Sequence, residues 1–301
     1  MIMNLKTLNF DVVVIGCGPA GITASIYLKR ANLNVCVVEK TAPGGQLNMI
    51  SEIGNYPGCK EIDGPTLAFN MFEQIRELNV TYKYGNVLEI INYDDYKVVK
   101  TDQEEITCKG IIIATGRRPR ELGLPNEKRL LGKGISYCSI CDGSLYKNKI
   151  ACVVGGGNSA LEGALYLSDI CSKVTLIHRK DTFRGEPYLV ERVEKKDNID
   201  IIKNANIIEI KSTNDRVSSL VLDIQKEVTT DALFIYIGNT PVPIKCENLN
   251  TENDYVIVDS NMKTNIDKIY ACGDAVKKTV YQMSTAIGDG ATAAMNLIRD
   301  L

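Results

Sequence analysis

A glycine-rich turn occurs twice in this chain, each time between a strand-like hydrophobic run and a helix-like stretch. The first copy is GCGPAG at residues 16–21, and the second is GGGNSA at residues 155–160. Each follows a run of valine and isoleucine and opens a stretch rich in alanine and leucine. Such a turn brings the N–H groups of a helix N-terminus close to a dinucleotide pyrophosphate. The repeat predicts an α/β chain with two Rossmann-like dinucleotide-binding domains, the second inserted into the first.

The sequence around both turns supports this prediction. One glycine fingerprint is weak evidence, whereas two copies in the same strand-turn-helix-strand context are strong. The expected order is a strand, a helix and a strand in each copy, at residues 11–15, 20–31 and 34–39, and again at 149–154, 160–167 and 173–177.

The residues that end the second strand of each copy differ in charge. Glu39 ends the first copy, and a carboxylate there suits the ribose hydroxyls of FAD or NAD. His178 has the equivalent position in the second copy, and Arg179, Lys180 and Arg184 follow it. Guanidinium and ammonium groups pair with a ribose 2′-phosphate, which a carboxylate would repel. The second domain is therefore predicted to prefer NADPH to NADH.

The sequence also contains one Cys-x-x-Cys pair, Cys138 and Cys141, between the two glycine turns. A pair at this spacing can form a disulfide and exchange it repeatedly with a partner. Asp142 follows directly and is expected to act as the acid and base for the reduced sulfur. A zinc site would need a second pair. The other eight cysteines stand singly, mostly in apolar runs where cysteine behaves as a small buried hydrophobic residue.

Three further hydrophobic runs, at residues 111–116, 232–238 and 269–274, set the domain limits. The first and third end in small residues that allow close backbone approach to a ligand, and Asp274 offers a second carboxylate for a sugar hydroxyl. The domains are expected at residues 1–114 and 244–301 for FAD and at 115–243 for NADPH and the Cys-x-x-Cys pair.

Composition limits the remaining classes of function. The chain has 301 residues, 45% of them hydrophobic, and a net charge of −2. No apolar run approaches the roughly 18 residues of a membrane span, and no basic block predicts a nucleic-acid partner. With one histidine, His178, a catalytic triad or a multi-histidine metal site has little support, and no metal is expected. These features predict a cytoplasmic enzyme.

Over essentially its whole length the chain resembles the low-molecular-weight thioredoxin reductases. The resemblance rests on the two glycine turns and the Cys-x-x-Cys pair, with shorter matches at residues 44–47, 55–58, 178–184 and 273–274. It implies FAD in the discontinuous domain, NADPH in the inserted one, a homodimer, and thioredoxin or a similar small dithiol protein as electron acceptor. It also implies that Cys141 lies next to the flavin while Cys138 attacks the partner, and that a helix beginning near Gln282 points at the flavin.

The predicted catalytic residues are Cys138, Cys141 and Asp142. The residues expected to contact the cofactors are Gly16, Gly18, Pro19, Ala20, Gly21, Glu39, Gly45, Gln46, Leu47, Asn55, Val87, Gly116, Asp274, Tyr281, Gln282, Met283, Gly155, Gly157, Asn158, Ser159, Ala160, His178, Arg179, Lys180, Arg184, Ile237 and Gly238.

The chain departs from the family pattern at Lys180 and Tyr281, where arginine is usual, and at Ser144 and Leu145, where some relatives have aromatic residues. Two alternatives stay open. One is a ferredoxin-linked relative without a working pyridine nucleotide site, against which the second glycine turn and its cations argue. The other is a non-catalytic flavin redox sensor.

Overall fold

The computed structural model describes residues 9–50 and 53–301, and it divides into two compact units. The first unit contains the described residues up to Asn48, residues 53–118, and Pro241–Leu301. The second contains Pro119–Thr240. The chain passes between them along β7 (Arg117–Pro119) and β16 (Asn239–Pro241), which pair with each other.

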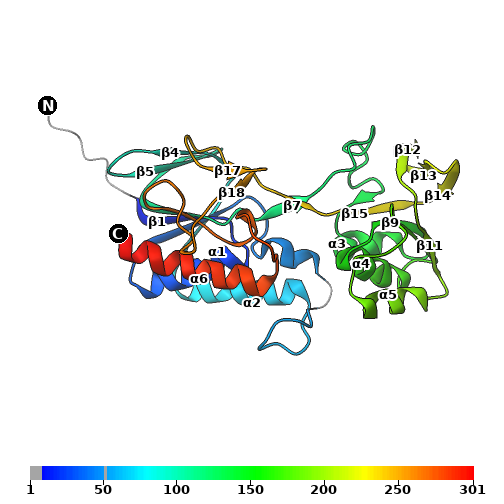
Figure 1. Ribbon diagram of the computed structural model, residues 1–301, viewed down its shortest axis with the longest axis horizontal. Coiled ribbons are helices and arrows are strands. Elements are labelled where there is room, and N and C mark those ends of the chain that lie inside the picture. Colours follow the sequence, from blue (N-terminus) through cyan, green and yellow to red (C-terminus); the bar gives the residue numbers. More distant parts are fainter. Residues whose placement is uncertain (1–8, 51–52) are drawn as a thin grey trace. The chain divides into compact units, whose positions relative to one another are not determined.

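The first unit is built on a seven-stranded sheet in the order β3-β2-β1-β6-β5-β4, with β19 also paired to β6 (Figure 1). The pairs β1–β2, β1–β6, β2–β3 and β6–β19 are parallel, whereas β4–β5 and β5–β6 are antiparallel. The elements of this unit are β1 (Phe10–Ile15), α1 (Pro19–Arg30), β2 (Val35–Glu39), the 3₁₀ helix η1 (Gly45–Met49), α2 (Gly64–Glu77), β3 (Thr81–Tyr84), β4 (Val87–Asn92), β5 (Lys97–Thr101), β6 (Glu105–Ile113), β17 (Thr251–Glu252), β18 (Tyr255–Val256), β19 (Ile269–Ala271), η3 (Gly273–Ala275) and α6 (Met283–Asp300).

The strands at the centre of this sheet are buried on both faces. Val12, Val13 and Val14 are successive residues of β1, and none of them is exposed to solvent. Runs of this kind are typical of parallel strands covered on both sides. Helices α1 and α6 pack against each other over one face, with α2 beside α1. The other face packs against buried side chains such as Val256 and Ile266.

The second unit has a five-stranded parallel sheet in the order β11-β10-β9-β15-β8 and a separate antiparallel sheet, β12-β13-β14. Its elements are β8 (Ile135–Ser136), α3 (Ser139–Asp142), η2 (Gly143–Tyr146), β9 (Ile150–Gly155), α4 (Asn158–Ser168), β10 (Lys173–Ile177), α5 (Pro187–Glu194), β11 (Ile199–Ile202), β12 (Ile207–Thr213), β13 (Arg216–Leu222), β14 (Lys226–Thr229) and β15 (Ala232–Tyr236).

Alternate residues of the parallel strands in this unit enter two different cores. Val153 and Phe234 pack on the side of α4 and α5, in a cluster with Leu161 and Leu189. Cys152, Val154 and Ile235 pack on the opposite side, together with residues of β12 and β13. This alternation follows from the two-residue side-chain period of a strand.

The predicted fold class is confirmed, because each unit has the expected strand-turn-helix-strand order around a parallel sheet. The assignment of FAD to the first unit and of NADPH to the second, with the predicted limits, stays a prediction. Among the described residues, no helix is long and apolar enough to cross a membrane.

Candidate active site

The first glycine turn joins β1 to the N-terminus of α1. Gly16 has a φ of +105°, and a Cβ at this position would lie 2.3 Å from the carbonyl oxygen of Ala114, so only glycine fits. Pro19 occupies the first turn of α1, where its missing N–H costs nothing. The first N–H groups of a helix have no partner within the helix, and together with the helix dipole they favour a bound phosphate. The turn therefore fits a pyrophosphate.

Glu39 is held beside this turn by three hydrogen bonds. The backbone N–H of Cys17 donates to Oε2 at 2.8 Å, while the N–H and hydroxyl of Thr41 donate to Oε1 at 2.8 and 2.7 Å. A carboxylate has about four acceptor positions, so it can still accept a hydrogen bond from a sugar hydroxyl. The N–H of Gly85 donates to the Glu39 carbonyl at 2.9 Å, which places the segment leading to Val87 beside the end of β2.

Other predicted FAD-contacting segments come together at the N-terminus of α1. A Cβ on Gly45 would lie 3.4 Å from the Cα of Gly18, and a Cβ on Gly273 would lie 2.7 Å from the Cβ of Ala20. Gln46 and Leu47 belong to η1 with Gly45. Segments far apart in sequence thus surround one helix N-terminus, as expected of a cofactor site.

The helix expected near Gln282 begins at Met283, with Gln282 as its N-cap residue. The Nδ2 of Asn55 donates to Oε1 of Gln282 at 3.4 Å, although 227 positions separate them in the chain. The structure therefore brings together two residues that the resemblance predicts to lie at the FAD.

Asp274 has a partner that the sequence analysis did not assign. The Nε and Nη2 of Arg117 donate to Oδ2 of Asp274 at 2.9 and 2.8 Å, and both side chains are only 16% exposed. The guanidinium also lies 4.1 Å from the ring centroid of Tyr281, a cation–π contact. The family usually has an arginine at position 281. In this chain position 281 is a tyrosine, and an arginine from another segment, Arg117, lies against its ring. Arg117 directly follows Gly116, a predicted cofactor contact. The sequence could therefore have indicated that Arg117 lies near the cofactor, although not that it pairs with Asp274.

The second glycine turn is crossed by the loop that carries the predicted phosphate-binding cations. The N–H of Arg184 donates to the carbonyl of Gly156 at 2.7 Å. Asn158 and Glu186 exchange two hydrogen bonds, each 2.8 Å long. At the same edge of the sheet, Tyr236 pairs with Gly155, so Ile237 and Gly238 leave β15 beside the turn. This arrangement gathers the predicted nucleotide contacts of the second unit.

His178 has a structural place in this loop. It is 4% exposed, its Nε2–H donates to the carbonyl of Thr182 at 3.0 Å, and its ring stacks on Phe183 with centroids 5.3 Å apart. Burial lowers the pKa of His178, and the neighbouring cations lower it further. It is therefore uncharged at neutral pH and does not add to the positive charge of Arg179, Lys180 and Arg184, which are exposed. Its contact with the cofactor stays a prediction.

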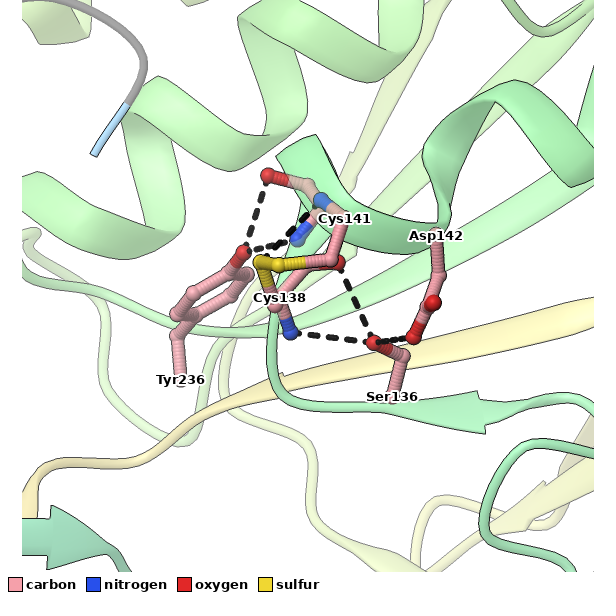
Figure 2. Close-up of a disulfide and its surroundings, with 6 residues drawn as sticks. Ser136, Cys138, Cys141, Asp142 and Tyr236 are labelled. Atoms are coloured by element: carbon pink, nitrogen blue, oxygen red, sulfur yellow. Dashed lines mark hydrogen bonds between the residues drawn. A yellow bond between two sulfur atoms is a disulfide. The ribbon is translucent and has the colours of Figure 1, made fainter. Parts of the chain in front are cut away.

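Cys138 and Cys141 form a disulfide, with their Cα atoms 5.3 Å apart (Figure 2). Cys138 is the N-cap residue of the four-residue helix α3, and the N–H of Cys141 donates to its Sγ at 3.1 Å. Cys138 is 8% exposed, whereas Cys141 is exposed.

Ser136 links Asp142 to this disulfide, a role that the sequence analysis missed. Its hydroxyl donates to Oδ2 of Asp142 at 2.7 Å and accepts from the N–H of Cys138 at 3.0 Å. Ser136 is 4% exposed, so these bonds are shielded from water. The orientation of the Asp142 carboxylate is therefore fixed by a residue two positions before the first cysteine.

The remaining cysteines are free thiols in the described part of the chain. Burial raises the pKa of Cys36 and of Cys152 to about 12, so neither is a reactive thiolate near neutral pH. Cys59 and Cys246 are half-buried. Residues 9–50 and 53–301 contain no group of three or more His, Cys, Asp or Glu side chains that could hold a metal ion.

Comparison with known proteins agrees with this geometry. Residues 10–290 match the pyridine nucleotide-disulphide oxidoreductase family. The chain belongs to this family. A thioredoxin reductase of Bacillus subtilis is 40% identical over 295 residues, covering 96% of this chain and 93% of the relative. The crystal structure of Lactococcus lactis thioredoxin reductase is 38% identical, with a TM-score of 0.92 and coverage of 97% of this chain and 99% of that one.

A third relative represents the ferredoxin-linked alternative. The ferredoxin-flavin thioredoxin reductase of Clostridium acetobutylicum is 29% identical, with a TM-score of 0.54, and covers 96% of this chain and 97% of its own. The resemblance to thioredoxin reductases is confirmed, as are the oxidoreductase class and the cofactors FAD and NADPH. The individual contact residues stay predictions.

We predict that Gly156→Ala destabilises the second unit. A Cβ at Gly156 would lie 2.2 to 2.6 Å from three atoms of the His178 ring, which is itself buried. Overpacking of this kind costs about 1–3 kcal/mol in free energy of unfolding. Urea unfolding without added nucleotide measures it. Gly157→Ala is the matched control, because no atom lies within 4 Å of the added Cβ. Equal loss of stability in both variants would contradict the steric explanation.

Proposed function

We propose that this protein is an NADPH-dependent thioredoxin reductase, in which electrons pass through FAD and the Cys138–Cys141 pair to the disulfide of thioredoxin or a similar small dithiol protein. The observation that carries the proposal is the disulfide between these two cysteines, in the unit that also contains the second glycine turn. The chemistry that the two bound cofactors would supply is two-electron transfer.

The reduced cysteine pair would act by thiol–disulfide exchange. One thiolate attacks a sulfur of the partner disulfide, that S–S bond breaks, and a mixed disulfide forms. The second thiol then attacks the mixed disulfide, which releases the partner as a dithiol and re-forms the Cys138–Cys141 bond. The N–H of Cys141 already points at Sγ of Cys138, so a negative charge on that sulfur has a hydrogen-bond donor in place.

The resemblance and the exposure of the two residues point to different cysteines as the one that attacks the partner. The resemblance assigns the attack to Cys138 and the position next to the flavin to Cys141. By exposure of the whole residue, Cys141 is more accessible than Cys138. We propose that Cys138 attacks the partner and that Cys141 lies next to the flavin, and the single-cysteine variants test this assignment.

Asp142 is proposed to hold and return the proton of the reduced pair. The hydroxyl of Ser136 connects its carboxylate to the N–H of Cys138 through two successive hydrogen bonds. That connection fixes one carboxylate oxygen and leaves the other available for a proton.

The cations of the second unit support the choice of NADPH. Arg179, Lys180 and Arg184 are exposed in the loop that crosses the glycine turn, while the buried neutral His178 supports the loop beneath them. This arrangement favours an NADPH-dependent enzyme over the ferredoxin-linked alternative, which lacks a working pyridine nucleotide site. In the first unit, Glu39 and Asp274 are the carboxylates proposed for FAD sugar hydroxyls. We also propose a homodimer, by analogy with the family, and a reducing cytoplasmic location, which suits the free thiols outside the redox pair.

We predict that replacing Arg179 and Arg184 together with alanine raises KM for NADPH far more than KM for NADH. Each charge-assisted contact to the 2′-phosphate is worth about 1.5–3 kcal/mol. Steady-state kinetics with both nucleotides measure the effect, and Arg192→Ala, an exposed arginine of α5, is the control. Equal losses with both nucleotides would show that these side chains do not recognise the phosphate.

Cys138→Ser and Cys141→Ser should each abolish thioredoxin reduction, because exchange needs both sulfurs. Each variant should still oxidise NADPH with a small-molecule electron acceptor. Cys59→Ser, which removes a half-buried thiol outside the pair, should retain full activity. In a trapping experiment, Cys141→Ser should form the mixed disulfide with thioredoxin. Trapping by Cys138→Ser instead would reverse the two roles, and normal turnover by either variant would overturn the proposed redox centre.

Asp142→Asn should slow thioredoxin reduction by the prereduced enzyme by about 10²–10⁴-fold, the range for loss of general acid–base catalysis. Asparagine can still accept the Ser136 hydrogen bond but cannot take up the proton. Single-turnover stopped-flow measurement isolates this step, and flavin reduction by NADPH should be unchanged. Asp169→Asn, at an exposed carboxylate of the same unit, is the control. A rate within threefold of the wild type would remove Asp142 from the mechanism.

A further inference from the structure

The redox pair is joined to the rest of its unit by a side chain that neither the sequence analysis nor the proposed function uses. Tyr236 is the last residue of β15. Its hydroxyl accepts a hydrogen bond from the N–H of Ser139 at 2.8 Å and donates one to the hydroxyl of Ser139 at 2.9 Å. Ser139 is 3% exposed and directly follows Cys138. Figure 2 shows Tyr236 beside the disulfide.

The ring of Tyr236 is fixed by the packing around it. A Cβ at Gly163 of α4 would lie 2.8 Å from a ring carbon of Tyr236, so the absence of a side chain at position 163 leaves the space that the ring fills. The backbone of Tyr236 pairs with Gly155. Burial raises the pKa of the Tyr236 hydroxyl, which therefore stays protonated and keeps its donor at neutral pH. The hydroxyl is thus presented to Ser139 from a rigid position.

Such an external support matters because α3 has only four residues, Ser139–Asp142. A single helical turn is unfavourable by itself, since several backbone angles are fixed for very few hydrogen bonds. In the oxidised protein, the disulfide closes this turn covalently. Reduction of the disulfide removes that closure, but it does not by itself break the hydrogen bonds that Tyr236 and Ser136 make to the turn in the disulfide form.

We propose that Tyr236 is a positioning residue for the redox pair: by holding Ser139, it keeps the two thiols of the reduced form close enough to re-form the disulfide. The inference rests on the proposed redox role of Cys138 and Cys141. Without the Tyr236 hydroxyl, the reduced turn can relax into other conformations, whereas the crosslinked turn cannot. Removal of the hydroxyl therefore favours the dithiol over the disulfide.

The test is a redox titration of the purified holoenzyme with reduced and oxidised dithiothreitol under nitrogen. In this equilibrium the protein disulfide takes up two electrons and two protons while dithiothreitol closes to its cyclic disulfide. Thiol alkylation followed by mass spectrometry of the peptide containing Cys138 and Cys141 gives the reduced fraction. This readout needs no turnover and no thioredoxin.

Tyr236→Phe keeps the ring against Gly163 and removes only the hydroxyl. We expect the equilibrium constant for reduction to rise about three- to tenfold, as expected for the loss of neutral hydrogen bonds, and tenfold corresponds to a potential about 30 mV more positive. Ser139→Ala loses one of the two bonds and keeps the bond from its N–H, so it should shift the constant in the same direction by a smaller factor.

Tyr166→Phe is the matched control. It also removes one tyrosine hydroxyl, on α4, but that hydroxyl makes no hydrogen bond to residues 9–50 or 53–301. An unchanged constant in Tyr236→Phe, a shift toward the disulfide, or an equal shift in Tyr166→Phe would overturn the inference. A wild-type protein whose Cys138–Cys141 pair cannot be reduced by dithiothreitol would defeat the proposed function itself. The two failures are therefore distinguishable.

Discussion

The close approach of backbone to backbone at the two glycine turns is the constraint on which the rest of the structure depends. At Gly16, a Cβ would collide with the carbonyl oxygen of Ala114, which directly follows strand β6 almost a hundred positions later. At Gly155, a Cβ would collide with the carbonyl oxygen of Tyr236, the last residue of β15. Because no side chain stands between the strand ends and the helix N-termini, unpaired N–H groups remain available to a phosphate in each unit.

The two units use their polar residues differently around this shared arrangement. In the first, the carboxylates Glu39 and Asp274 are held in place by backbone N–H groups and by Arg117. In the second, the buried ring of His178 supports a loop whose cations face solvent. One βαβ pattern thus carries carboxylates in one unit, which we propose for sugar hydroxyls, and cations in the other, which we propose for a 2′-phosphate.

The short helix that carries the redox pair depends on neighbours for its shape. Ser136 contacts it at Cys138 and Asp142, and Tyr236 contacts it at Ser139. A redox centre must keep nearly the same geometry whether its disulfide is closed or open, since exchange requires the two sulfurs to meet again. Hydrogen bonds from residues of β8 and β15 meet this need, because they hold the turn at the N–H of Cys138 and at Ser139 and not at the sulfurs.

The sequence by itself determined the elements whose cause is local. The glycine turns, the strand and helix periods on each side of them, and the Cys-x-x-Cys spacing all act over a few residues, so the fold class and the redox pair were predictable. Only the tertiary structure decided which distant groups meet. Arg117 reaches Asp274, Asn55 reaches Gln282, and Tyr236 reaches Ser139. It also decided that His178 is buried and neutral, although its sequence neighbours are exposed cations. These contacts join residues tens to hundreds of positions apart, and no local pattern encodes them. They exist because the parallel strands end at a common edge of the sheet and because helix packing leaves space at particular glycines.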